Sequence, residues 1–268
     1  MPAPDIPRPG HFYEFDGELA VPSELTRGPW DEDSQHAGPP AALLGRALEQ
    51  LPVDDAVPMR FGRVTYEVLR PVPIAPLRVE AWLERGGRRV QMLGASLHDG
   101  DEEVMRARAW RLRTEEVELA ADFPRAAPGH GPADGDEAPF FATGAADGYH
   151  TAVEYRFIKG EFVEPGPAVV WMRSRVPVVA GEQLTPLQRV LVVADSGNGV
   201  SATLDWRRFL FINVDLTVHL HRLPAGEWVC LDAVTTPEAD GIGLADTVLS
   251  DEGGRIGRAL QTLLVAER

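Results

Sequence analysis

The chain has 268 residues, 44% of them hydrophobic and 25% charged, which is the composition of a globular protein with material for one large or two smaller cores. The formal net charge of -15 argues against a general nucleic-acid-binding protein, because phosphate binding requires clustered lysine and arginine. The single cysteine, Cys230, excludes an intramolecular disulfide and a cysteine-based zinc site, and its apolar surroundings predict a small core residue.

The N-terminal sequence MPAPDIPRPG has neither the cationic start nor the apolar run of a signal peptide. The sequence contains no stretch of 18 or more apolar residues, so no transmembrane helix is predicted. We therefore expect a cytoplasmic protein without a membrane span.

The first half of the chain reads as a strand, a helix and then a run of strands. Phe12–Leu19 is predicted to be the first strand. Proline near a helix start, followed by Ala and Leu at helical spacing, predicts a helix that begins at Pro39 or Pro40 and continues to Leu51. Four strands are then predicted, with turns supplied by Gly86-Gly87 and by Asp99-Gly100-Asp101. These strands are Gly62–Val72, Leu77–Arg85, Arg88–Asp99 and Glu103–Arg113.

The second half repeats this order of elements. Two strands are predicted at Val153–Phe162 and Ala168–Val176, and a helix at Pro186–Ala194. Four further strands follow at Phe211–Arg222, Trp228–Thr235, Gly243–Ser250 and Gly254–Ala266.

A shift of 152 residues superposes parts of the two halves without gaps. Arg70 then falls on Arg222, and Asp99 on Asp251. With the shared element order, this echo predicts a duplication into an N-terminal domain 1–114, a linker 115–149 and a C-terminal domain 150–268. The linker is rich in Ala, Gly, Pro and Asp and is expected to be an exposed connection, partly ordered by Phe140 and Phe141.

The predicted fold class is α+β, with one helix against a strongly curved antiparallel sheet in each half. Pairing the two units would produce a continuous sheet with both helices on its concave side.

Several motifs resemble those of hotdog thioesterases. Residues 36–44, HAGPPAALL, are similar to the G-G-x-x-x-A-x-L opening of the central helix, and residues 66–71, YEVLRP, with VEA at 79–81 are similar to the first long strands. In the second half, NVDL at 213–216, HR at 221–222 and EW at 227–228 resemble a pattern of type II (TesB-like) acyl-CoA thioesterases. The motifs are short, and their order and spacing carry the resemblance over nearly the whole chain apart from the linker.

The resemblance implies a double hotdog fold and hydrolysis of acyl-CoA or another acyl thioester, without a cofactor. In that family an Asp, a Thr or Ser, and a Gln position the attacking water. Carried over, Asp195 matches the Asp and Gln261 the Gln, while Asn213 stands at the hydroxyl position. Asn can hold a water through its amide but cannot relay a proton as a hydroxyl can. Fused halves resemble the dimer of single-domain relatives, and further assembly into a homo-oligomer is compatible with this plan.

The residues themselves support two interpretations of this set. Asp195 directly follows an apolar run and is suited to act as a general base, but it also opens the turn-like sequence DSGNG. Gln261 alternates with apolar neighbours and could equally face solvent. Asn213 and Asp215 share one face of a strand, which fits either a wet site or an exposed surface, and Asp215 could equally pair with an arginine.

The start of the first helix is a candidate substrate-binding region. Gly38 permits close approach of a thioester carbonyl to the backbone, and His36 is a candidate polar contact or a simple loop histidine. Pro39 and Pro40 lack N–H groups, which weakens an oxyanion site there. His219 and His221 lie on one strand face and are expected to be surface or packing residues, since no metal-ligating neighbours accompany them.

Three functions compete. The first is a thioesterase using Asp195, Asn213 and Gln261. The second is a hotdog enoyl-CoA hydratase, disfavoured because no histidine closely follows Asp195. The third is a non-catalytic acyl-binding protein with a degenerate site. The absence of a G-x-S-x-G elbow disfavours an α/β-hydrolase, and the lone Gly241-Ile242-Gly243 is no dinucleotide fingerprint.

Overall fold

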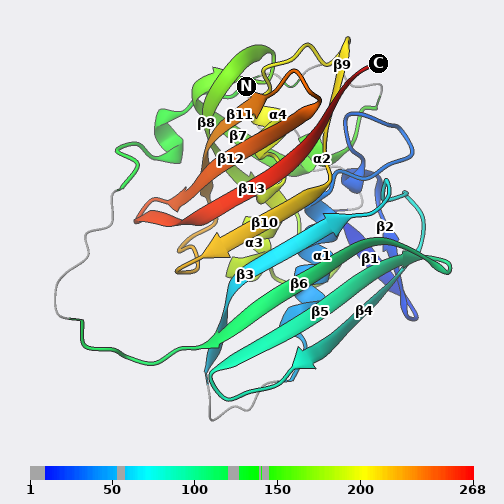
Figure 1. Ribbon diagram of the computed structural model, residues 1–268, viewed down its shortest axis with the longest axis vertical. Coiled ribbons are helices and arrows are strands. Elements are labelled where there is room, and N and C mark those ends of the chain that lie inside the picture. The colour runs from blue at the N-terminus through cyan, green and yellow to red at the C-terminus, as the bar shows by residue number, and fades with distance from the viewer. Residues whose placement is uncertain (1–9, 53–57, 120–126, 139, 141–144) are drawn as a thin grey trace.

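The computed structural model describes residues 10–52, 58–119, 127–138, 140 and 145–268. In this part of the chain, thirteen strands form one antiparallel sheet, and the two longest helices pack against one of its faces (Figure 1). This is the predicted arrangement of helices beneath a curved sheet.

The first half follows the predicted order with one difference. The strand expected at Phe12–Leu19 is a hairpin, because Gly17 adopts a positive φ of 61° and reverses the chain. The elements are β1 (Tyr13–Asp16), β2 (Leu19–Pro22), the 3-10 turn η1 (Glu24–Thr26), α1 (Gly38–Glu49), β3 (Met59–Val68), β4 (Leu77–Arg85), β5 (Val90–Asp99) and β6 (Glu102–Arg113).

The second half contains two short helices that were not predicted. The first helix is formed by Tyr149–Ala152. The second is formed by Gly197–Val200, in the sequence after Asp195 that was predicted to be a turn. The strand expected at Phe211–Arg222 is interrupted at Val214. The elements are η2 (Pro132–Asp134), α2 (Tyr149–Ala152), β7 (Val153–Glu161), β8 (Glu164–Ser174), α3 (Pro186–Ala194), α4 (Gly197–Val200), β9 (Phe209–Asn213), β10 (Asp215–Leu220), β11 (Val229–Pro237), β12 (Ile242–Asp251) and β13 (Gly254–Glu267).

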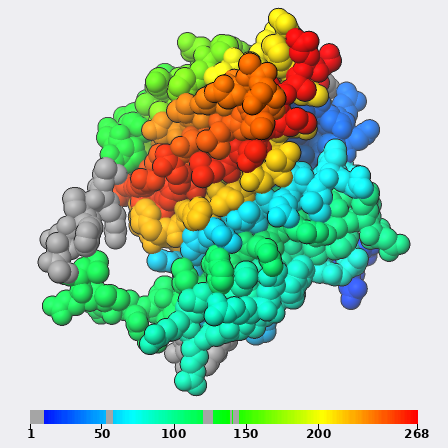
Figure 2. Space-filling model, in the orientation of Figure 1, coloured from blue at the N-terminus to red at the C-terminus, as the bar shows by residue number. Residues whose placement is uncertain are grey.

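The strand order of the sheet is symmetric about its middle. It runs β1-β2-β4-β5-β6-β3-β10-β13-β12-β11-β8-β7, with β9 paired to β13 beside this path. Reading outward from the centre, each strand of the first half has its counterpart in the second. Figure 2 shows the two halves meeting as one continuous surface along β3 and β10.

The centre of this symmetry lies between Thr65 and Thr217. These residues face each other in the β3–β10 pair, and the Thr217 hydroxyl hydrogen-bonds the Thr65 hydroxyl at 3.3 Å. Their separation in sequence is 152 residues, the same offset as the echo between the halves. The duplication inferred from sequence therefore corresponds to a pseudo-twofold axis through the middle of the sheet.

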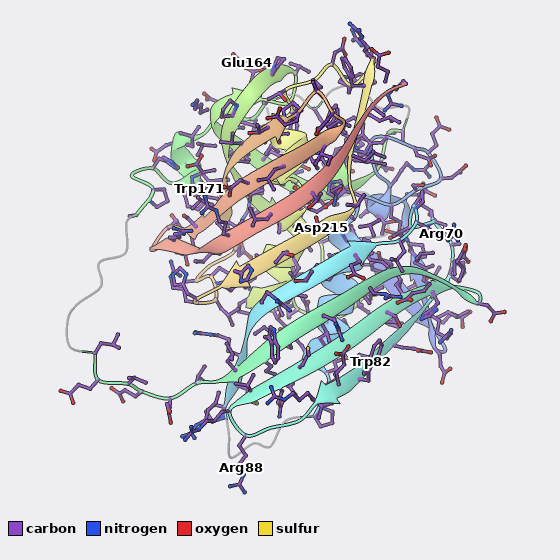
Figure 3. All side chains as sticks on the ribbon, viewed as in Figure 1. Arg70, Trp82, Arg88, Glu164, Trp171 and Asp215 are labelled. Atoms are coloured by element: carbon purple, nitrogen blue, oxygen red, sulfur yellow. The ribbon has the colours of Figure 1, made fainter. Side chains whose placement is uncertain are left out.

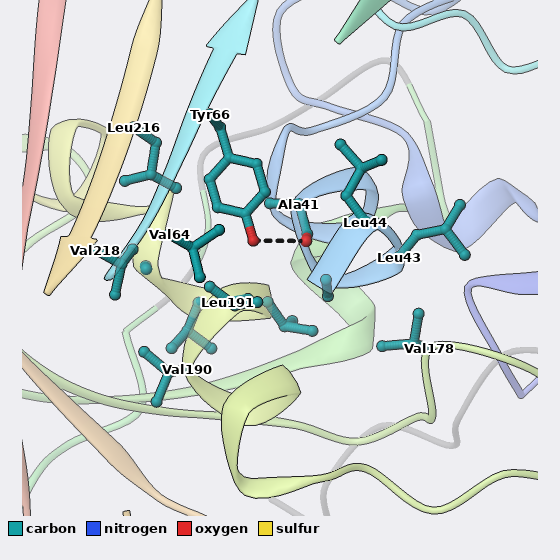
Figure 4. Close-up of a cluster of buried hydrophobic side chains, with 14 of the residues drawn as sticks. Ala41, Leu43, Leu44, Val64, Tyr66, Val178, Val190, Leu191, Leu216 and Val218 are labelled. Atoms are coloured by element: carbon teal, nitrogen blue, oxygen red, sulfur yellow. Dashed lines mark hydrogen bonds between the residues drawn. The ribbon is translucent and has the colours of Figure 1, made fainter. Parts of the chain in front are cut away.

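The two long helices contact each other and form the centre of the core (Figure 4). Gly45 lets α1 approach α3 closely, since a Cβ there would lie 2.3 Å from Leu191 Cδ1. The buried Tyr66 hydroxyl donates to the Ala41 carbonyl at 3.0 Å, so β3 and α1 are joined by a satisfied polar contact inside the apolar core.

Part of the segment predicted to be a linker contacts β8 in the second half. The indole N–H of the buried Trp171 donates to His130 Nδ1 at 3.1 Å. Cys230, paired with Trp171 across β8 and β11, is buried as predicted, and burial raises the pKa of its thiol to about 12. Phe140 packs on Phe162, whereas Phe141 lies outside the described residues.

Among the helices of the described chain, none is both long and apolar enough to cross a membrane.

Candidate active site

Asp195 lies at the C-terminal end of α3, where it is the C-cap residue. The helix is locally well specified: Thr185 and Gln188 form a capping box, Pro186 occupies the first turn, and an apolar run follows. Asp195 is 7% exposed, so the carboxylate is delivered into the protein interior. A buried carboxylate requires hydrogen-bonding or charged partners.

Three side chains from different elements surround this carboxylate. Asn213 at the end of β9 donates from Nδ2 to Asp195 Oδ1 at 2.9 Å, and Gln261 in β13 donates from Nε2 to the same oxygen at 3.1 Å. His36, which precedes α1 in the other half, places Nδ1 3.2 Å from Asp195 Oδ2. The structure thus brings together the four side chains singled out in the sequence.

Gln261 is used entirely in holding Asp195 and the following turn. Its Nε2 also donates to the Asp195 carbonyl at 3.0 Å, and its Oε1 accepts from the Asn198 N–H at 3.0 Å. Gly197 permits this contact, since a Cβ there would meet Thr247 Oγ1 at 2.4 Å. The side chain is 1% exposed, so the alternative of a solvent-facing strand residue is wrong.

Asn213 reaches the carboxylate at the point where the strand is interrupted. Its Nδ2 also contacts the Asp215 carbonyl at 3.3 Å, and its side chain lines the cavity beside Asp195. Asp215 has another role, since its Oδ1 accepts from the Thr262 N–H at 2.6 Å. Asp215 therefore bridges β10 to β13 without an arginine partner among the described ion pairs.

His36 is stacked on Tyr149 with ring centroids 3.7 Å apart and an interplanar angle of 8°. Burial lowers the pKa of His36, and the nearby Asp195 charge opposes this shift. The neutral imidazole can accept the Gly38 N–H at Nδ1, at 3.1 Å. A proton on Nδ1 would instead bond Asp195, so the two contacts of this nitrogen belong to different protonation states.

Gly38 permits a close backbone approach as predicted, but the group that approaches it is the backbone of α3. A Cβ on Gly38 would lie 2.2 Å from the Val192 carbonyl oxygen of α3. Its N–H is taken by His36, and Pro39 and Pro40 supply no further amide donors. The observed reason for glycine here is therefore the crossing of α1 and α3.

Sequence reasoning missed three polar neighbours of this centre. Tyr149 donates its hydroxyl to the Val192 carbonyl at 2.8 Å and lies 2.9 Å from Ser196 Oγ. Asn198 donates from Nδ2 to the Phe211 carbonyl at 2.8 Å. Tyr149 stands in the segment read as linker, so no local signal indicated it. The DSGNG sequence predicted a turn, and in the structure it forms α4, with Ser196 as the N-cap and Asn198 in the helix.

A cavity of about 410 Å³ opens beside these residues. Its lining includes Asp195, Asn213 and His36, whereas Gly38 and Gln261 do not contribute to it. One part of the wall is aromatic, and the other is formed by the 29–36 loop and the segment after β3.

Within the described part of the chain, no group of three or more His, Cys, Asp or Glu side chains is arranged to hold a metal ion. His219 and His221 are both exposed, as expected of surface residues.

Solved structures with the same architecture define the class of fold. The chain is similar to a protein from Novosphingobium aromaticivorans (TM-score 0.68, 18% identity, covering 90% of this chain and 91% of that one). It is similar to a hot dog fold protein from Alicyclobacillus acidocaldarius (TM-score 0.67, 19% identity, covering 95% of this chain and 94% of that one). It is also similar to the acyl-CoA thioesterase II TesB2 from Mycobacterium marinum (TM-score 0.63, 14% identity, covering 88% of this chain and 90% of that one). The predicted double hotdog fold is confirmed.

Family models then identify the kind of protein. Residues 26–112 match the acyl-CoA thioesterase N-terminal domain and residues 121–265 match the acyl-CoA thioesterase C-terminal domain. The chain belongs to the acyl-CoA thioesterase family, as the TesB-like resemblance predicted. A comparison with curated proteins produced no match.

Proposed function

We propose that the chain hydrolyses acyl-CoA thioesters with a water molecule that Asp195 activates. The family supplies the reaction class, and the observation that supports this mechanism is the buried Asp195 carboxylate at the cavity wall, held by two amide donors. A carboxylate fixed in this way is preorganised to accept a proton from a water at the thioester carbonyl.

In the proposed reaction, Asp195 takes a proton from water while the water oxygen bonds to the carbonyl carbon. The tetrahedral oxyanion then collapses, the C–S bond breaks, and the thiolate takes the proton back. The products are a carboxylic acid, which ionises, and free CoA. Asp195 is regenerated in its ionised form and needs no cofactor.

Asn213 and Gln261 have different roles in this proposal. Gln261 is a positioning residue, because its amide contacts only Asp195 and the Asn198 backbone. Asn213 lines the cavity and orients both the carboxylate and the water. The amide cannot relay a proton, so Asp195 alone performs the proton transfer.

One observation favours a second candidate, an enoyl-CoA hydratase. The sequence argument against it was that no histidine closely follows Asp195, but His36 reaches Asp195 from the other half at 3.2 Å. An Asp–His pair could protonate and hydrate a double bond. Membership of the thioesterase family makes hydrolysis the stronger proposal.

Thiol release from a panel of acyl-CoAs, followed with a thiol-reactive dye, tests the proposal. We expect turnover by the wild type and a loss of at least about a hundredfold in kcat for Asp195→Asn, since general-base catalysis contributes 10²–10⁴. Asn213→Thr restores the hydroxyl of the family pattern and should remain within about tenfold of wild type.

Glu49→Gln is the matched control, because Glu49 is a half-buried carboxylate at the end of the other central helix and does not line the cavity. It should keep wild-type turnover. Thiol release at background level would favour a binding protein, and full activity in Asp195→Asn would refute the mechanism. Loss of crotonyl-CoA absorbance without thiol release would support the hydratase.

A further inference from the structure

A line of aromatic side chains leads from the proposed reactive carboxylate along the cavity. His36 faces Asp195 and is stacked on Tyr149. Tyr155, like Tyr149, is a buried residue of the cavity lining. The Tyr155 ring then meets Phe162 at a centroid distance of 4.8 Å and an angle of 78°.

These rings are fixed by one another. Phe140 contacts Phe162 at 4.5 Å between centroids with an angle of 66°, and Phe157 contacts Phe162 from another side at 4.9 Å. Edge-to-face contacts of this kind are a preferred arrangement of aromatic rings. Phe140, Tyr149, Tyr155 and Phe162 all line the cavity, and we call these four rings the aromatic wall.

Other residues of the cavity lining are more exposed than the tyrosines of the aromatic wall. Trp30, Leu69, Ile212 and Val214 are between 39% and 44% exposed, whereas Tyr149 and Tyr155 are 2% and 8% exposed. Phe140 and Phe162 are half-buried, so the aromatic wall is the more buried part of the lining. A thioester with its carbonyl at Asp195 would place its apolar acyl group in this part, and its large polar carrier toward the exposed residues.

We infer that the acyl group which this site takes is a short acyl group bearing an aromatic ring, such as phenylacetyl. This inference rests on the proposed hydrolysis at Asp195. The aromatic wall presents fixed ring edges and faces, which gain energy from a planar aromatic partner beyond the burial of apolar area. A saturated ring of the same size would bury similar area without that electrostatic fit.

The test compares phenylacetyl-CoA with cyclohexylacetyl-CoA, which differ only in the saturation of the ring. Hydrolysis by the full chain is measured as thiol release, and the readout is the ratio of the two kcat/KM values. We expect phenylacetyl-CoA to be preferred by roughly two- to tenfold, the discrimination typical of one aromatic contact.

Variants of the wall show whether the preference arises there. Phe162→Leu and Tyr155→Leu should bring the ratio close to one, while Tyr155→Phe keeps the ring and should keep the ratio. The hydroxyl that Tyr155→Phe removes has no hydrogen-bond partner in the described part of the structure. Trp82→Leu is the control, because Trp82 lies on β4 in the first half, outside the cavity lining (Figure 3).

A wild-type ratio of one or below overturns the inference even if the leucine variants fail to fold. A preference that survives in both folded leucine variants also overturns it. Failure of the proposed function has a different signature, namely no thiol release from either substrate or full activity in Asp195→Asn.

Discussion

The helix pair α1 and α3 has two ends, one where α3 ends beside the start of α1 and one where α1 ends beside the start of α3. The pseudo-twofold axis relates these two ends, but their side chains differ in chemistry. Where α3 ends and α1 begins, the C-cap is the buried Asp195, beside a cavity. Where α1 ends and α3 begins, the C-cap is the exposed Gln50. The preceding Glu49 accepts from Thr185 Oγ1 at 2.9 Å and from Gln188 Nε2 at 2.8 Å. That carboxylate joins the two helices.

The strands beneath the two crossings diverge in the same way. At the 152-residue offset, Asn213 corresponds to Phe61 and Gln261 to Ala109, and both first-half residues are buried and apolar. The nearby Arg111 donates from Nη1 to the Leu51 carbonyl at 3.1 Å, fixing the chain after α1.

One backbone plan therefore places a buried carboxylate beside a cavity at one crossing, and a carboxylate that joins the two helices at the other. At Asp195 the amide donors come from β9 and β13 and a cavity opens beside the carboxylate, whereas Glu49 is bound by side chains at the start of α3.

The largest effect is expected from Gln261→Ala, which converts the second-half position to the alanine of the first half. Asp195 would lose an amide donor, and about a hundredfold of kcat should be lost if the carboxylate shifts by roughly 1 Å. KM should change little. Thr262→Ala, on the exposed neighbouring residue, is the matched control. Equal losses in both variants would show a general destabilisation of β13 instead.

Gly38→Ala tests the close helix crossing at the end where Asp195 lies. The new Cβ would meet the Val192 carbonyl at 2.2 Å, and overpacking against backbone costs about 1–3 kcal/mol. The midpoint of thermal unfolding should fall by several degrees. Gly199→Ala adds a Cβ with no atom within 4 Å and should leave the midpoint unchanged. Equal midpoints in the two variants would contradict the tight crossing.

The smallest effect concerns the pH dependence of the Glu49 contact between the two helices. Burial raises the pKa of Glu49 above its ordinary value of 4.5, partly offset by the hydrogen bonds from Gln188 and Thr185. The folded state then binds more protons than the unfolded state above pH 4.5, so Glu49 lowers stability as the pH rises through that window.

Glu49→Gln removes this titration. Its unfolding midpoint relative to wild type should therefore rise between pH 4 and pH 7.5, which thermal melts in matched buffers would measure. A difference between variant and wild type that is independent of pH would argue against a raised pKa.

Much of the architecture was present in the sequence, because local chemistry specified it. The capping box and apolar run fixed α3 at Pro186–Ala194 as predicted, and Gly86-Gly87 ends β4 at Arg85 as predicted. The 152-residue offset predicted the duplication, and the contact between Thr65 and Thr217, which are 152 residues apart, lies at its centre of symmetry. Family motifs also indicated Asp195, Asn213 and Gln261, which meet in space.

The tertiary structure decided how those residues meet. His36 joins Asp195 from the other half, and Tyr149 stacks on His36 from the segment read as linker, contacts that depend on how the two halves pack. In the sequence, Gln261 is one polar residue in an apolar strand. Only the structure shows that its amide donates hydrogen bonds to Asp195. Helices and turns follow from neighbouring residues, whereas a site between two halves depends on distances that the sequence does not contain.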